Sequence, residues 1–205
     1  MERSERELTG TAYAILGLLG VQSWSAYELT KQMERSVDTF WPRASSRVYA
    51  EVKRLADEGL AEATKERVGR RPRTVYSITA DGRAELEAWL RSPGRGLSVE
   101  FEALAKVFFA DQGDLEGLQV NLHAALEWAR DRKTATSEVA ASIREDGGAY
   151  PDRLAVNALV FAFKADMAAF VERWATWAIE TTSDWPDDAD AWVPPMEVFD
   201  ADEEL

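Results

Sequence analysis

The sequence contains no cysteine and a single histidine, His123. The absence of thiols excludes disulfide bonds, iron–sulfur clusters, zinc fingers and cysteine nucleophiles. One histidine leaves no pair for a polyhistidine metal site and one candidate for a serine–histidine triad. On a predicted helix with no second metal ligand nearby, His123 is best interpreted as an ordinary side chain. We therefore expect no metal site, no cofactor and no catalytic residue.

Motifs of familiar enzymes are also missing. The chain has no Gly-x-Ser-x-Gly elbow, no phosphate-binding loop and no paired metal ligands. We find no run of about 18 or more apolar residues and no signal peptide pattern, which predicts neither a membrane span nor secretion. The expectation is a cytoplasmic protein that is not an enzyme.

Positive charge is scarce overall, and the net charge is −13. The deficit is uneven, because residues 1–95 hold 16 Lys and Arg against 14 Asp and Glu, whereas residues 96–205 hold 8 against 23. Residues 41–75 carry 9 basic side chains against 5 acidic ones. Charges more than about 10 Å apart are largely screened at physiological salt, so a local basic patch can bind phosphates even on an acidic protein.

The first 60 residues predict three helices, over about 9–20, 25–36 and 45–59. The start of the second helix is the clearest signal, because Ser25 and Glu28 have the spacing of a capping box. No strand is predicted before the end of the third helix.

A change of period after residue 60 predicts a β-hairpin. Residues 60–68 and 74–79 are rich in β-branched and aromatic side chains, and the run Gly-Arg-Arg-Pro-Arg at 69–73 lies between them. A further helix then begins at about residue 79, and the Ser-Pro-Gly-Arg-Gly run at 92–96 predicts a linker.

Three helices, a hairpin and a linking helix are the element order of a winged helix-turn-helix. In that fold the third helix enters the DNA major groove and the hairpin contacts the backbone or the minor groove. Basic and polar side chains gather at both places. The predicted DNA contacts are Ser45, Ser46, Arg47, Tyr49, Lys53, Arg70, Arg71 and Arg73. The alternatives are helix capping for the two serines, packing for Tyr49 and a solvated turn for the basic tip.

Residues 97–180 predict an α-helical unit, with one helix from Leu97 to Phe108, a second over about 114–145 and a last helix after Gly147-Gly148. The last helix carries a helix–helix seam at alternating steps of four and three: Val156, Val160, Phe163, Met167, Phe170, Trp174 and Trp177. The seam is covered either by residues 97–145 or by a second copy, and we favour the second copy. The predicted dimer contacts are Phe101, Phe108, Val160, Phe163, Met167, Phe170 and Trp174.

Two further features concern the tryptophans and the C-terminus. A pocket for a flat aromatic effector is predicted at Trp89, Trp128, Trp174 and Trp177, with core packing as the alternative. Residues 181–205 contain nine Asp and Glu, no Lys or Arg, and three prolines. This composition predicts a mostly unfolded acidic tail that aids solubility or covers the basic surface.

Residues 47–60 and 69–83 resemble the PadR family. In that family a Tyr early in the recognition helix precedes a Leu-x-x-Leu-x-x-x-Gly-Leu type of stretch, and an Arg-rich wing leads into Tyr-x-Leu/Ile-Thr-x-x-Gly. The matching residues are Tyr49, Leu55, Gly59, Tyr76, Thr79 and Gly82. The chain departs from the pattern at Ala50, where many members have Pro, and at Val52, where Leu is usual.

The resemblance implies a mainly α fold. It places an N-terminal winged helix-turn-helix (three helices, β-hairpin wing, linking helix) at 1–92 and an α-helical dimerisation domain at 97–180, followed by the acidic tail at 181–205. It also implies a homodimeric, sequence-specific transcriptional regulator that binds a pseudo-palindromic operator in double-stranded DNA. Family habit favours a repressor, released in some members by a small effector. The alternative is a winged-helix adaptor that binds a protein partner instead of DNA.

Overall fold

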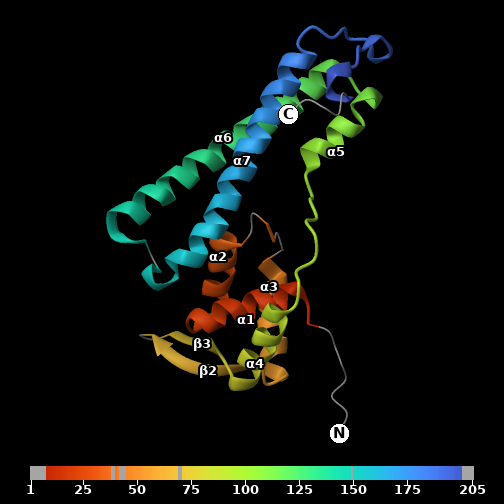
Figure 1. Cartoon of the computed structure of the whole chain (residues 1–205). Helices are drawn as coiled ribbons and strands as arrows, with labels where there is room; N and C mark the ends of the chain where they lie inside the picture. The colour runs from red at the N-terminus through yellow and green to blue at the C-terminus, as the bar shows by residue number, and fades with distance from the viewer. Residues whose placement is uncertain (1–7, 38–39, 42–44, 69–70, 149, 200–205) are drawn as a thin grey trace. The chain divides into compact units, whose positions relative to one another are not determined.

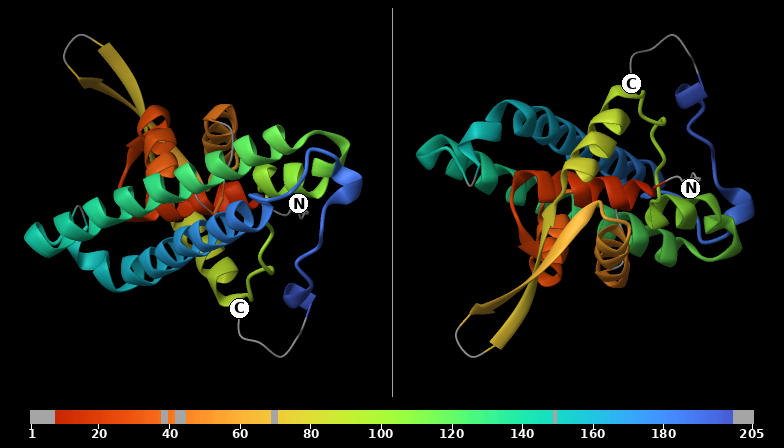
Figure 2. Two further views of the ribbon diagram at one scale, coloured as in Figure 1. Left: turned by 90° about the horizontal axis from the view of Figure 1, so that it is seen from above. Right: turned by 90° about the horizontal axis from the view of Figure 1, so that it is seen from below.

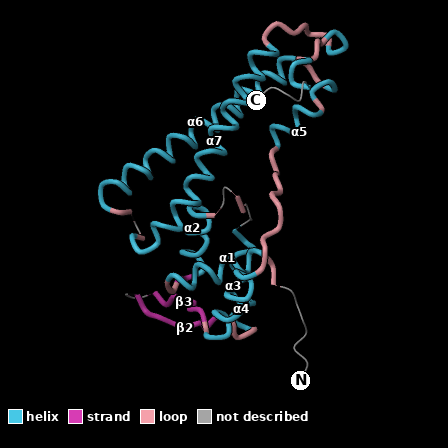
Figure 3. Tube along the Cα trace, in the orientation of Figure 1, coloured by secondary structure: helices cyan, strands magenta, loops and turns pink. Residues whose placement is uncertain are grey.

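The structure is a computed structural model, and it divides the chain into two units, Met1–Leu97 and Ser98–Leu205 (Figure 1). The residues that it describes are 8–37, 40–41, 45–68, 71–148 and 150–199. Helices dominate both units, and the sheet that is described lies in the first (Figure 3). The predicted mainly α fold is confirmed.

The first unit has the element order of a winged helix. Its elements are α1 (Gly10–Val21), β1 (Trp24–Ser25), α2 (Ala26–Ser36), α3 (Ser45–Asp57), β2 (Ala61–Val68), β3 (Arg71–Ile78) and α4 (Ala80–Arg91). The antiparallel sheet has the strand order β1-β3-β2. Strand β1 is too short to carry a sequence pattern and was not predicted.

Local sequence determines several element ends in this unit. The backbone N–H of Ser25 donates to Glu28 Oε2 at 2.8 Å, and the backbone N–H of Glu28 donates to Ser25 Oγ at 3.3 Å, which is the predicted capping box. Gly59 follows α3 with φ +77°, a conformation that favours glycine. At Gly82, a Cβ would lie 2.1 Å from the carbonyl oxygen of Leu60, so only glycine permits this approach of α4 to the chain before β2.

The helices α1, α2 and α3 share one hydrophobic core. The fully buried side chains include Ile15, Leu16, Leu29, Val48, Val52 and Leu55. The last three come from α3 at steps of four and three, so they form one face of that helix. Burial of this face fixes which side of α3 remains available to a partner.

The second unit is built on two long helices. Its elements are α5 (Glu102–Phe108), η1 (Ala110–Gln112), α6 (Leu115–Asp146), η2 (Pro151–Arg153), α7 (Leu154–Thr182), η3 (Ala189–Ala191) and η4 (Met196–Phe199). Helices α6 and α7 pack side by side (Figure 1). Asp114 caps α6, accepting from the backbone N–H of Gly117 at 2.7 Å, and Gly147 ends it with φ +80°.

The predicted helix from Leu97 to Phe108 is wrong in its first part. Helix α5 begins at Glu102, and Phe101 precedes it in extended backbone as the N-cap residue. The apolar spacing that suggested a longer helix has another cause, because the Phe101 ring packs against Trp174 with ring centroids 5.7 Å apart. Phe101 is thus engaged within its own chain.

Helix α7 packs against α6 mainly through small residues, together with Trp174 of its apolar seam. The buried residues of α7 are Ala168, Val171, Ala175, Ala178 and Thr182. In contrast, Val156, Phe163 and Phe170 of the seam are 51%, 44% and 58% exposed. Of the two interpretations of the sequence, cover of the seam by residues 97–145 therefore does not hold for most of the seam.

The helical stretch Pro151–Thr182 is apolar enough, and long enough, to cross a membrane by length and composition. The sequence prediction of no membrane span rested on the absence of an uninterrupted apolar run, and this stretch is interrupted by Lys164, Asp166 and Glu172. A single helix of this kind is weak evidence of a membrane protein, because helices that pack in soluble proteins pass the same test. The buried residues of α7 are mostly small, and several of its large apolar residues are exposed.

The chain after α7 differs from the predicted unfolded tail. Trp185 and Trp192 stack with ring centroids 4.9 Å apart and pack against the cluster of Leu118, Leu122 and Ala178. Two short 3-10 turns, η3 and η4, lie in this segment. The acidic composition predicted disorder, but Trp185 and Trp192 pack this segment against the second unit.

Candidate nucleic-acid interface

The solvent face of α3 carries a short run of polar and basic side chains. Arg47 and Lys53 are exposed, and Tyr49 is 47% exposed. Ser45 and Ser46 form the first turn of the helix, although their side chains lie outside the described part of the structure. Within the described residues, Arg47 and Lys53 form no ion pair, so their charges are available to an anion.

Arg54 lies on the same helix but is held by its own chain. Its guanidinium donates to Glu51 at 2.7 and 3.1 Å and to Glu58 at 2.9 Å. Glu51 also accepts from the Thr9 hydroxyl at 2.6 Å, which connects the start of α1 to α3. The hydrogen bonds from Arg54, and then that from Thr9, hold the pKa of Glu51 below its ordinary value of 4.5. Arg54 is therefore a structural residue of α3.

The hairpin of β2 and β3 projects from the helices of the first unit (Figure 2). Arg73 of this hairpin, a predicted DNA contact, donates to Glu28 at 3.0 Å and to Glu66 at 3.3 Å. Hydrogen bonds from Ser25, and then the charge of Arg73, lower the pKa of Glu28. Two predicted wing contacts remain. Arg70 lies outside the described residues, and Arg71 is described in its backbone alone.

The face of β2 opposite to that of Glu66 carries two basic side chains that were not among the predicted contacts. Lys65 and Arg67 are two residues apart, so they share one face of the strand, and both are exposed. Their cross-strand partners are Thr74 and Pro72, which are uncharged, whereas Glu66 lies opposite Arg73. Basic residues at every second position, Lys65 and Arg67, were the sequence signal that could have identified this face of the strand.

The arrangement is therefore a buried three-helix core that presents α3 on one side, with a two-stranded wing beside it. Such a surface suits the backbone and groove edges of a duplex, because a helix fits the major groove and basic wing residues can contact phosphates. The first unit is a winged-helix domain.

Comparison with known proteins relates this domain to one family. Residues 15–88 match the family described as transcriptional regulator PadR-like, which confirms the resemblance found in the sequence. It is 33% identical over 99 residues to the negative transcriptional regulator PadR of Bacillus subtilis. That match covers 47% of this chain and 54% of the relative, so the chain spans about half the length of the curated relative it matches.

Solved structures support the fold over a longer stretch. A crystal structure of Bacillus subtilis PadR in complex with operator DNA matches with a TM-score of 0.70 and 21% identity, covering 83% of this chain and 98% of that one. A structure of the same protein in complex with p-coumaric acid matches with a TM-score of 0.55 and 20% identity, at 83% and 98% coverage. At these identities the likeness establishes the fold.

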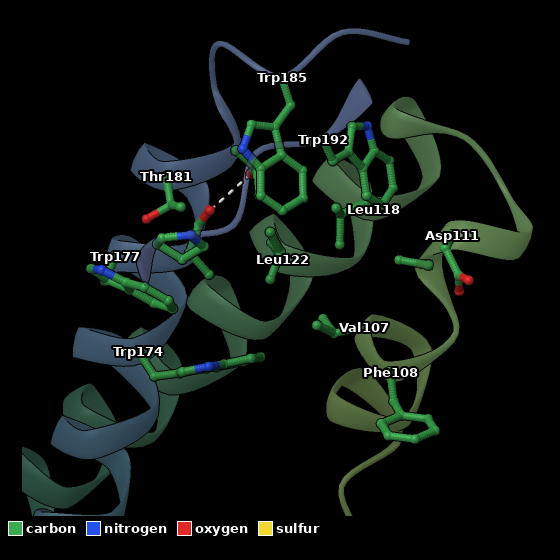
Figure 4. Close-up of a pocket in the computed structure, with 14 residues that line it drawn as sticks. Val107, Phe108, Asp111, Leu118, Leu122, Trp174, Trp177, Thr181, Trp185 and Trp192 are labelled. Carbon is green, nitrogen blue, oxygen red and sulfur yellow. Dashed lines mark hydrogen bonds between the residues drawn. The ribbon is translucent and has the colours of Figure 1, made fainter. Parts of the chain in front are cut away.

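The predicted effector tryptophans are divided between the two units. Trp89 belongs to the first unit and stacks on Tyr13, with ring centroids 4.7 Å apart. Trp128 lies beside Phe101 at a centroid distance of 6.4 Å. Trp174 and Trp177 line a cavity in the second unit, together with two tryptophans from the segment after α7 (Figure 4).

The described residues offer no group of three His, Cys, Asp or Glu that could hold a metal ion. His123 is exposed, and its Nδ1 lies 2.8 Å from the carbonyl oxygen of Gln119, four residues earlier on α6. The curated relative is named as a transcriptional regulator and not as an enzyme.

Proposed function

We propose that the chain is a cytoplasmic, sequence-specific DNA-binding transcriptional regulator that acts as a homodimer. The observation that carries the proposal is the two-sided construction of α3 inside a PadR-like domain. One face is buried through Val48, Val52 and Leu55, and the other presents Arg47, Tyr49 and Lys53 to solvent. Ser45 and Ser46 begin this helix and complete the proposed set on α3, while Arg70, Arg71 and Arg73 supply the wing.

For Arg73 to contact DNA, its guanidinium must exchange a carboxylate partner for a phosphate. Its guanidinium lies beside Glu28 and Glu66, and exposed ion pairs of this kind contribute about 0 to 1 kcal/mol each. A phosphate can therefore replace a carboxylate at small cost. Lys65 and Arg67, on the other face of β2, are additional candidates for phosphate contacts, and both are exposed.

The homodimer is supported by the uncovered seam of α7. Leu159 next to the seam is 74% exposed, and Phe163 and Phe170 of the seam are also exposed in the single chain. Large exposed apolar patches on a soluble protein mark interaction sites. A second copy that covers Val160, Phe163, Met167 and Phe170 would bring two winged helices onto neighbouring turns of one duplex, with half-sites roughly 10 base pairs or a small multiple apart.

Repression released by a small aromatic effector is the finer part of the proposal. It is supported by the name of the Bacillus subtilis relative, a negative regulator, and by the complex of that protein with p-coumaric acid. In this chain the cavity lined by Trp174 and Trp177 offers aromatic surface in the second unit.

The test is selection of bound fragments from a random pool of duplex DNA by the full chain at two salt concentrations. We expect enrichment of an inverted repeat. Replacing Arg47 with Ala should weaken binding to that site by about 1 to 3 kcal/mol if Arg47 contacts a base. Replacing Lys53 with Ala should reduce the slope of log affinity against log salt by about 0.9 if Lys53 contacts a phosphate.

Arg83→Ala is the matched control, because Arg83 is an exposed base of α4 in the same unit. Its affinity and salt slope should equal those of the unchanged chain. Equal affinity in Arg47→Ala, Lys53→Ala and Arg83→Ala would contradict a role for α3.

The adaptor is the second candidate, and one observation favours it. Arg73, which a DNA wing would present to phosphates, is paired with two carboxylates of its own unit. An adaptor would show no enriched sequence in the selection while the dimer still forms. That result would favour a protein, and not DNA, as the partner of the winged helix.

A further inference from the structure

The second unit contains a cavity of about 380 Å³ between α5, the first half of α6, the end of α7 and the segment that follows α7 (Figure 4). Pockets of about 300 to 1,000 Å³ are typical of small organic ligands. Four indole rings dominate the lining, from Trp174, Trp177, Trp185 and Trp192. The size and the rings together suit a flat molecule of two or three fused rings.

The segment after α7 forms one wall of this cavity. Trp185 and Trp192 stack on each other at an interplanar angle of 27°, and Trp192 Nε1 donates to the carbonyl oxygen of Pro186 at 2.9 Å. The backbone N–H of Trp185 donates to the carbonyl oxygen of Thr182 at 3.3 Å. These bonds hold the segment as a cover over Leu118 and Leu122 of α6.

The cover distinguishes this end of α7 from the rest of its seam. Phe163 and Phe170 are 44% and 58% exposed in the single chain, and the proposed function assigns that stretch to a second copy. At Trp174 and Trp177 the chain supplies its own cover and still leaves the cavity. A small molecule, and not a partner helix, is the occupant that suits a cavity lined by four segments of one chain.

The charge around the cavity selects among flat molecules. Asp111 is the charged residue among the described residues that line it. Residues 96–205 carry 23 acidic side chains against 8 basic ones, which disfavours an anion. The faces of indole rings attract cations, and tryptophan does so most strongly among the aromatic side chains.

We propose that this cavity is a binding site for a planar aromatic cation, with the Trp185–Trp192 segment as its cover. The inference rests on the proposed function in one respect, because such a ligand would act there as the effector of the regulator. It differs in charge from p-coumaric acid, the ligand named for the Bacillus subtilis structure.

The experiment uses the full chain without DNA and two three-ring fluorescent probes, proflavine as the cation and anthracene-9-carboxylate as the anion. Fluorescence anisotropy should show saturable binding of proflavine, and at least tenfold weaker binding of the carboxylate. Equal binding of both probes would overturn the charge argument, and no saturable binding of proflavine would overturn the site.

The variants separate the cavity from general attraction to an acidic protein. Trp177→Leu keeps an apolar side chain but removes a ring face, and should weaken proflavine binding about tenfold. Trp128→Leu is the matched control, because Trp128 lies in the same unit at 37% exposure against 39% for Trp177 but does not line the cavity. Equal loss in both variants would overturn the site, provided that thermal melting shows both folded.

The second pair of variants concerns the charge. Asp111→Asn should reduce the preference for the cation severalfold, whereas Asp152→Asn, an exposed residue of η2 that does not line the cavity, should leave it unchanged. An unchanged preference in Asp111→Asn would remove Asp111 from the site. Because no DNA is present, these results are independent of whether the chain binds an operator.

Discussion

The two units of the chain differ in how well each covers its own hydrophobic side chains. The first unit buries a continuous core from α1, α2 and α3, in which Ile15, Leu29 and Leu55 are fully buried. In the second unit α7 buries mainly small residues and leaves large ones such as Phe163 and Phe170 exposed. The first unit thus covers its own core, whereas the second leaves apolar surface that the proposed homodimer would cover.

This difference assigns a task to each unit. A self-sufficient core holds α3 rigidly, so that its outer face can present a fixed set of groups to DNA. An incomplete helical unit ties its stability to association, because burial between copies replaces burial within one copy. In the proposed function, recognition of DNA and pairing of two copies are therefore separated along the chain.

The largest expected effect comes from opening the core of the first unit. Leu55→Ala should destabilise that unit by about 3 kcal/mol, because a fully buried leucine leaves a cavity. Chemical denaturation followed by circular dichroism measures the loss, which should not depend on protein concentration. Leu90→Ala, at a position 65% exposed, is the control and should change stability by less than about 0.5 kcal/mol.

The second effect concerns the uncovered seam. Phe163→Glu places a charge in the proposed interface and should weaken dimerisation roughly a hundredfold or more, measured by sedimentation equilibrium. Ala162→Glu, an exposed position next to it on α7, should leave the dimer intact. Equal dimerisation in both variants would mean that the seam is not the interface, and the contrast between the units would then need another explanation.

A smaller effect is expected at the start of α2. Ser25→Ala removes one half of the capping box and should cost about 1 kcal/mol of the stability of the first unit. Ser23→Ala, at an exposed position just before it, provides the comparison in the same denaturation experiment. An equal loss in Ser25→Ala and Ser23→Ala would contradict the capping role of Ser25.

The smallest effect is a pH dependence at Glu51. Its pKa in the folded chain is lowered below 4.5, so its contribution to stability is present above that pH and is lost as the pH falls through the folded value. Glu51→Gln should therefore show a weaker decline of stability below about pH 4.5, by roughly 0.5 kcal/mol. Denaturation at pH 6 and pH 3 measures it, and parallel declines would contradict the role of Arg54 as the partner of Glu51.

Much of the fold followed from local patterns in the sequence. The capping box at Ser25, the end of α3 at Gly59 and the break at Gly147 each depend on a few neighbouring residues, and each appears where it was predicted. Strand β1 was missed because two residues become a strand only through pairing with Val75 and Tyr76 of β3.

The candidate site was less accessible to sequence reasoning. The exposed bases of α3 could be predicted from their position, but the ion pair of Arg73 with Glu28 joins residues 45 positions apart, and no local pattern signals it. The tryptophans after α7 were hidden in an acidic, proline-containing stretch whose composition favoured disorder. Trp185 and Trp192 become part of a cavity wall only because α6 lies beside them.

The most direct test of this account is the mass of the full chain bound to the selected duplex, measured by sedimentation equilibrium. Two chains on a duplex that carries an inverted repeat would agree with recognition by the first unit and pairing by the second. A single chain on a single half-site, with the affinity of the full repeat, would contradict it.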